Sequence, residues 1–157
     1  MYRLAKFGYL FVFSLLVGFM AVVQWSLVPA QNRLDAQGYA VLEKGMNNVL
    51  TTLTPALMIA SIVFGLIVVV LAFRRGSNMR VWFTLAVVSV VAMTISTLVI
   101  NAPVNAAIDA WNAAAPPADW QALRDRWEFG HLLRSYVGLV GLAIAHAASL
   151  WEANETR

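Results

Sequence analysis

Three long stretches without a charged residue constrain this chain more strongly than any other feature. They cover residues 7–28, 49–73 and 81–100. A helix of about 22 residues is about 33 Å long, which is enough to cross a hydrocarbon core of about 30 Å. A fourth stretch, 132–151, contains Arg134 and His146 but is otherwise uncharged. The sequence therefore predicts an all-α integral membrane protein, with one transmembrane domain over residues 1–157 built as a four-helix bundle.

The composition favours a membrane protein over a soluble one. Only 12% of the residues are charged and 61% are hydrophobic, whereas soluble domains carry about 25% charged residues. The first stretch could alternatively be a signal peptide, because Arg3 and Lys6 precede it and Val28-Pro29-Ala30 resembles a cleavage site. It is longer than the about 7–15 residues of a signal-peptide core, so we expect a retained helix.

The basic residues predict how the bundle lies in the membrane. They flank the first stretch and fill the turn after the second: Arg3, Lys6, Arg74, Arg75 and Arg80. Because short loops rich in Lys and Arg stay in the cytoplasm, we expect a multi-pass protein of the inner (plasma) membrane with both termini cytoplasmic. The net charge of +3 then reflects topology. We expect contact with the lipid bilayer and no nucleic-acid partner.

Two longer connections should lie outside. In residues 29–48, apolar side chains recur at steps of three and four, which indicates a short amphipathic helix on the membrane surface. In residues 101–130, Pro103 should kink or end the third span near Asn101, leaving a broken segment, because proline lacks an N–H and clashes with the preceding turn. A later helix is expected to run without a break into the fourth span.

Polar residues form stripes on the third and fourth spans. The third carries Thr94, Thr97, Asn101 and Asn105, and the fourth carries His131, Arg134 and Gly138, all at steps of three or four. Ionisable groups within a membrane deserve a functional hypothesis. The alternatives are structural: the asparagines cap a broken helix, and Arg134 extends to the lipid headgroups. Gly138 and Gly141 favour an Arg134 that points into the bundle, because glycines allow close helix packing.

The sequence gives little support for a metal site or for thiol chemistry. The chain has no cysteine, which excludes disulfides and thiolate sites. Glu128-x-x-His131 is only half of a di-iron motif. His131 and His146 are about 22 Å apart on one helix, too far for a shared haem. A single metal held by mixed ligands is left open, but we expect no metal site and no evident cofactor.

The outer connections supply further binding candidates. Glu43 follows Asp35 and Tyr39 at helical spacing and could face the mouth of the bundle, although a solvated polar face is the alternative. Tryptophans at the ends of the spans read as interfacial anchors: Trp25, Trp82 and Trp151. Three more could be anchors or could form the wall of an aromatic-binding pocket: Trp111, Trp120 and Trp127.

Several motifs together resemble a known family. They are Leu34-Asp35-Ala36-x-x-Tyr39, Leu42-Glu43-x-Gly45-Met46-Asn47, Leu53-Thr54-Pro55, Asn101-x-Pro103-x-Asn105 with Trp111, and Trp120 with Arg124-Asp125-Arg126-Trp127-x-x-x-His131-x-x-Arg134. They resemble bacterial membrane proteins of unknown function called anthrone-oxygenase-like. The resemblance implies a four-helix membrane bundle. Fungal members oxidise anthrones to anthraquinones with dioxygen and need no evident cofactor. The family's polar positions correspond to Asn101, Asn105, His131 and Arg134.

Two functions follow as hypotheses. In the first, the protein is an oxygenase or oxidoreductase for an aromatic or lipophilic substrate that enters between the third and fourth spans, with dioxygen as co-substrate. Arg134 would stabilise an enolate, His131 would remove a proton, and Asn101 and Asn105 would orient oxygen atoms. The substrate would contact Trp111, Trp127, Glu43 and Tyr39. In the second, the protein is a non-catalytic subunit of a larger membrane complex or a homo-oligomer.

Overall fold

The computed structural model describes residues 1–155, with side chains through residue 152. Within that part every regular element is a helix, and four helical rods are long and apolar enough to cross a membrane. The expected all-α membrane bundle is confirmed. The first rod joins α1 (Tyr2–Val22), the π-helix η1 (Val23–Leu27) and α2 (Val28–Gln31); the second is α3 (Ala36–Arg74); the third joins α4 (Arg80–Ser96), the π-helix η2 (Thr97–Asn101) and α5 (Ala102–Asp109); the fourth is α6 (Trp120–Glu155).

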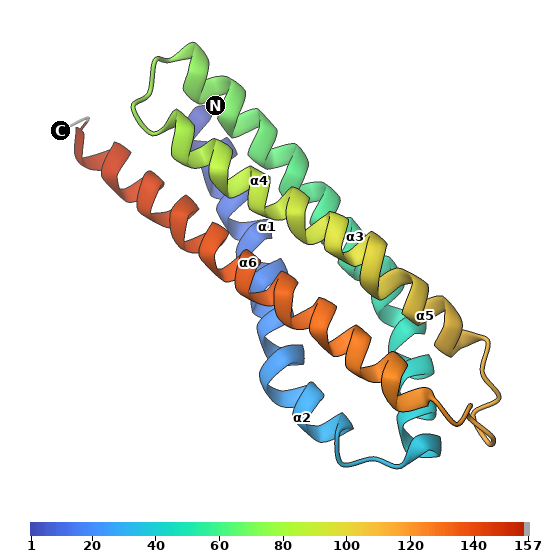
Figure 1. Cartoon of the computed structure of the whole chain (residues 1–157). Helices are drawn as coiled ribbons and strands as arrows, with labels where there is room; N and C mark the ends of the chain where they lie inside the picture. The colour runs from blue at the N-terminus through green and yellow to red at the C-terminus, as the bar shows by residue number, and fades with distance from the viewer. Residues whose placement is uncertain (156–157) are drawn as a thin grey trace.

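The two ends of the bundle differ in what they carry. The start of α1, the end of α6 and the turn between α3 and α4 lie at one end, which we call the terminal end. The loops after α2 and α5 lie at the other, the distal end (Figure 1). At the terminal end Glu152 accepts hydrogen bonds from Tyr2 (2.9 Å), Lys6 (2.5 Å) and Ser77. This cluster ties α1, the α3–α4 turn and α6 together.

The core and the outer surface are both apolar, as a bilayer requires. Aromatic and aliphatic side chains such as Tyr9, Phe13 and Met93 are buried between the helices. Equally apolar side chains face outward, including Leu66 (50% exposed) and Val140 (61% exposed). An outer face this apolar would be costly in water but fits lipid. The chain is therefore a multi-pass membrane protein.

Glycines bring α4 and α6 into close contact along their length. A Cβ added at Gly141 would lie 1.7 Å from Ser89 Oγ, and one at Gly138 would lie 2.9 Å from Met93. Gly138 and Gly141 are both buried, which confirms that this face of the fourth span points into the bundle. These contacts close the α4–α6 interface at Gly138 and Gly141, on the terminal side of Arg134.

The variant Gly141→Ala should therefore destabilise the bundle by about 1–3 kcal/mol, because the new methyl group overpacks a filled interface. Its midpoint of thermal unfolding in detergent should fall below that of the wild type. The control is Gly18→Ala, since a Cβ at Gly18 has no atom within 4 Å. Equal midpoints for the two variants would show that α4 and α6 are not packed as described.

The second rod differs from the expected surface helix. Residues 36–48 do not form a separate helix on the membrane but continue directly into the second span as α3. At 1.5 Å per residue, a helix of 39 residues is about 58 Å long, so α3 extends beyond the hydrocarbon core. Asp35 caps its start, because its carboxylate accepts a hydrogen bond from the Gly38 N–H at 2.8 Å. Asp35 thus has a structural role.

The third rod does not break at Pro103. Instead the helix widens to the π-helix η2 just before the proline. There the Ala102 N–H bonds to the Thr97 carbonyl, five residues back. The first rod uses the same device, since η1 also ends two residues before a proline, Pro29. Widening the helix by one residue accommodates a proline that would otherwise clash with the preceding turn. The irregular segment comes later than expected, over residues 110–119.

Candidate functional site

A cavity of about 200 Å³ lies in the distal half of the bundle, where all four rods contribute to its wall. We call it the polar cavity. Part of its wall is apolar, including Phe19 and Leu50. Its ionisable and amide-bearing residues come from α3, α5 and α6. Those polar residues are Glu43, Asn47, Asn105, His131 and Arg134, joined by Thr97 of η2 and two threonines of α3. Polar side chains that line a cavity within an apolar bundle mark a candidate binding or active site.

Arg134 is a buried cation in this cavity. Its side chain is only 6% exposed, and it points into the bundle and not toward lipid headgroups. The guanidinium donates hydrogen bonds to His131 Nδ1 (2.7 and 3.1 Å) and Thr97 Oγ1 (3.1 Å), and it lies 5.7 Å from the centre of the Trp127 ring. No carboxylate of the described residues lies within 4 Å of it. The charge is thus hydrogen-bonded and stacked but not neutralised.

His131 holds Arg134 in place. Its Nε2 lies 3.2 Å from the Met20 carbonyl oxygen, and its Nδ1 faces the guanidinium. A carbonyl only accepts and a guanidinium only donates, so the proton is on Nε2 and the Nδ1 lone pair points at Arg134. The Trp127 ring stacks on the imidazole with centroids 5.0 Å apart. Both nitrogens are therefore occupied, and His131 offers the cavity no free base.

Glu43 is the carboxylate of the polar cavity. It is fully buried on α3, and Oε1 accepts a hydrogen bond from Gln31 Nε2 at the end of α2. Oε2 has no hydrogen-bond partner among the described residues. A buried carboxylate oxygen without a partner is costly. One cavity therefore holds a cation without a carboxylate and a carboxylate with a free oxygen.

The two asparagines of the third rod have different positions. Asn105 lines the polar cavity, and its Oδ1 accepts a 2.7 Å hydrogen bond from the indole N–H of Trp127. Asn101 does not line it. Its Nδ2 donates to the Trp127 carbonyl at 2.9 Å, and a Cβ on Gly130 would lie 2.7 Å from its Oδ1. Asn101 thus fastens η2 to α6 where the two helices are closest.

Of the residues predicted to contact the substrate, some line the polar cavity and others do not. Glu43 and Trp127 line the polar cavity, whereas Tyr39 and Trp111 do not. The Tyr39 ring lies 5.3 Å from that of Trp120, and the Trp111 carbonyl accepts a 2.7 Å hydrogen bond from Lys44. Both aromatic rings belong to a smaller apolar cluster at the distal end.

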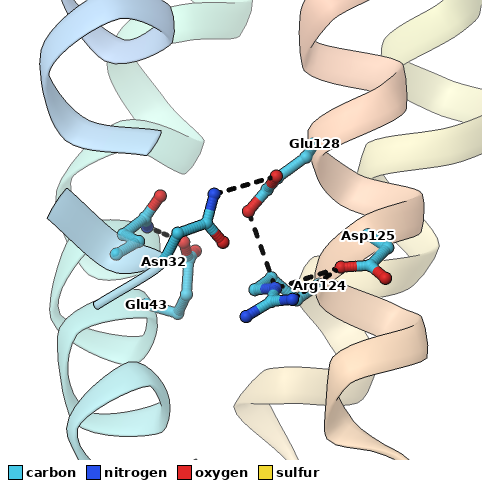
Figure 2. A network of polar contacts seen from close by, with 6 residues as sticks. Asn32, Glu43, Arg124, Asp125 and Glu128 are labelled. Carbon is cyan, nitrogen blue, oxygen red and sulfur yellow. Dashed lines mark hydrogen bonds and ion pairs between the residues drawn. The ribbon is translucent and has the colours of Figure 1, made fainter. Parts of the chain in front are cut away.

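A network of polar residues lies at the distal end near the cavity (Figure 2). Asn32 donates to Glu128 at 3.3 Å, and Glu128 lies 3.7 Å from Arg124, which also pairs with Asp125 at 2.9 Å. The network joins the loop after α2 to α6. In the described part of the chain, no group of three or more His, Asp or Glu side chains comes together in a way that could hold a metal ion.

Sequence reasoning missed two residues of the site. Asn47 lies one turn after Glu43 and donates to Asp109 Oδ1 at 3.0 Å, linking α3 to α5. Its spacing from Glu43 was a signal that could have revealed it. Gln31, the partner of Glu43, lies in the connection 29–48, whose apolar spacing says nothing about this contact, and only the fold brings the two together.

Comparison with known proteins now bears on this site. Residues 44–144 match the family model described as anthrone oxygenase. The chain belongs to the anthrone oxygenase family. No curated protein and no solved structure matches it. The stretch shared with the anthrone oxygenase family includes Asn105, His131 and Arg134, while Glu43 lies one residue before it.

Proposed function

We propose that this protein is a membrane oxygenase that oxidises an enolisable aromatic substrate, of which an anthrone is the type, with dioxygen. The observation that carries the proposal is that Glu43 and Arg134 line the same cavity and that neither has a charged partner within contact distance. A substrate with an acidic C–H conjugated to a carbonyl, as the CH₂ of an anthrone is through its aromatic rings, satisfies both. It gives a proton to the carboxylate and presents an oxyanion to the cation.

The chemistry balances without a further reductant. Glu43 Oε2 removes a proton from the CH₂ group, and the electron pair moves onto the carbonyl oxygen, where Arg134 stabilises the enolate. The electron-rich carbon then reacts with dioxygen to form a C–OOH group. Loss of water from this group forms the new C=O bond. One oxygen atom enters the product and the other leaves as water, so an anthrone and O₂ yield an anthraquinone and H₂O.

The remaining residues position these two groups. His131 and Thr97 fix the guanidinium through hydrogen bonds. The Trp127 indole, held by Asn105, lines the cavity and adds an aromatic contact for the substrate. This differs from the sequence-based hypothesis, in which His131 was the base. In the proposed scheme His131 is a positioning residue and Glu43 is the base.

Oxygen uptake tests the proposal. Purified protein in detergent, supplied with a panel of anthrones and hydroquinones, should consume one O₂ per anthrone and release the anthraquinone, at a rate above that of a protein-free control. No uptake above the control with any member of the panel would contradict it. A non-catalytic accessory role is the alternative. It predicts a stoichiometric partner in a mild pull-down and an occluded bundle centre, and the polar cavity favours the oxygenase.

We also propose an inner-membrane protein with both termini in the cytoplasm. Because the chain has no cysteine, single cysteines can report the topology. Asn78→Cys in the α3–α4 turn and Ala115→Cys in the α5–α6 segment are both at exposed positions. A membrane-impermeant maleimide should label Ala115→Cys on intact cells and Asn78→Cys only after lysis. The reverse pattern would contradict the proposed orientation.

A further inference from the structure

A second hollow, of about 660 Å³, lies between the first rod and α3. We call it the apolar groove. Its lining runs from Phe19 to Leu27 on the first rod and from Val41 to Leu50 on α3, and Ser26 is its one polar side chain. Val22 and Val49 on its rim are 63% and 64% exposed. In a protein whose helices span a membrane, such a groove faces lipid.

The apolar groove adjoins the polar cavity. Four residues line both: Phe19, Val23, Met46 and Leu50. Glu43 lies on α3 between groove residues Leu42 and Gly45, but its side chain belongs to the cavity. A molecule could therefore occupy both spaces at once, with its polar part near Glu43 and its apolar part in the groove.

The cavity is closed where α6 packs against the third rod. Gly130, Gly138 and Gly141 bring α6 against the third rod, and a Cβ on any of them would lie within 3.0 Å of a neighbouring atom. At the distal end, the network of Asn32, Arg124 and Glu128 joins the loop after α2 to α6. Between α3 and the third rod the cavity wall also includes exposed residues, namely Thr51, Pro55, Leu98 and Ala102. The groove is the larger of the two hollows, and its lining is apolar except for Ser26.

We propose that the apolar groove holds the hydrocarbon chain of an amphipathic substrate whose aromatic head lies in the polar cavity. This inference rests on the proposed function and narrows its substrate to phenolic or enolisable aromatics that carry an aliphatic chain and reach the site laterally from the bilayer. The cavity favours such a head over a phospholipid phosphate. It contains one cation and one carboxylate, and the free oxygen of Glu43 would repel a phosphate and accept a proton from a phenol.

Gly45 allows the groove to be blocked without disturbing the bundle. A Cβ there has no atom within 4 Å, and the residue lines the groove but not the polar cavity. Gly45→Trp should fill the groove and leave the head site intact. Gly18→Trp is the matched control, because Gly18 also has open space at its Cβ but lines neither hollow. Val49→Trp fills the groove from an exposed position and gives a second test if Gly45→Trp does not fold.

The experiment measures binding under nitrogen, so that it does not depend on turnover. The full chain in phosphatidylcholine nanodiscs is titrated with 4-decylphenol and with 4-methylphenol, which share a head and differ in the chain. Partition of each probe into the lipid is the same for every variant. Gly45→Trp should weaken binding of 4-decylphenol about tenfold or more, because overpacking a filled site costs that much. Binding of 4-methylphenol should stay within about twofold, and Gly18→Trp should change neither.

Several results would overturn the inference. They are an unchanged affinity of Gly45→Trp and Val49→Trp for 4-decylphenol, an equal loss for both probes, and a phospholipid that stays in the groove at saturating 4-decylphenol. If groove-dependent binding holds but no panel member supports oxygen uptake, the oxygenase proposal alone fails.

Discussion

Glu43→Gln should lower the rate of oxygen uptake with an anthrone by about 10²–10⁴-fold, the usual contribution of a general base. Glutamine keeps the size of the side chain and its hydrogen bond with Gln31 but cannot take a proton. The rate is measured with an oxygen electrode at saturating substrate, and circular dichroism checks that the variant is folded. The loss should appear in kcat more than in KM, because the missing step is chemical.

Two companion variants sharpen this result. Asp125→Asn removes a carboxylate whose side chain is 65% exposed at the distal end, and it should keep the wild-type rate. His131→Gln should lower the rate less than Glu43→Gln does, because His131 acts through Arg134. Full activity in Glu43→Gln, or a greater loss in His131→Gln, would remove Glu43 from the role of base.

Arg134→Met should lower the same rate by about 10²–10³-fold, as removal of an oxyanion donor does elsewhere. It should not destabilise the protein. The guanidinium is buried without a carboxylate partner, and an isolated buried charge costs free energy that a methionine of similar length avoids. We expect a midpoint of thermal unfolding equal to or above that of the wild type, together with the loss of activity.

Arg124→Met is the matched control for this variant. Arg124 also lies over a tryptophan ring, that of Trp120 at 5.2 Å, but it is paired with acidic residues outside the cavity. Its replacement should leave the rate within about twofold. Arg134→Lys should give an intermediate rate, because an ammonium keeps the charge but loses the planar fork that bonds His131 and Thr97. Wild-type activity in Arg134→Met, or its unfolding, would contradict the account.

Much of the fold could be predicted because it depends on local composition. Three stretches without charge and a fourth that is nearly uncharged predicted the four spans, and the glycines at 138 and 141 correctly indicated the inner face of the fourth. The separate surface helix expected in residues 29–48 was wrong, because helical spacing does not say whether a helix lies on the membrane or continues into it. The π-helices could not be predicted either, since proline equally permits a kink, a break or a widened turn.

Part of the site could also be predicted, because helical spacing indicates which residues share one face of a helix. Thr97, Asn101 and Asn105 all face α6, as their spacing indicated, yet Gly130 brings α6 so close that Asn101 is left no open space. Helical spacing predicts which side of a helix a residue faces, but it does not predict how much open space lies beside that residue. His131 has no free nitrogen partly because its Nε2 bonds to the Met20 carbonyl, a backbone group 111 residues away. No sequence pattern records such a contact, so only the fold separates the base from the residue that positions the cation.

The most direct measurement of the central claim is the absorbance of an anthrone mixed with the protein in the absence of oxygen. Without dioxygen the reaction should stop after proton removal, and the conjugated enolate should accumulate at the site with absorbance at longer wavelength than the neutral anthrone. The wild type should give this band, Arg134→Met a much weaker one, and Glu43→Gln none. A wild type without the band, or a Glu43→Gln variant that forms it fully, would contradict the assignment of Glu43 and Arg134 as base and oxyanion partner.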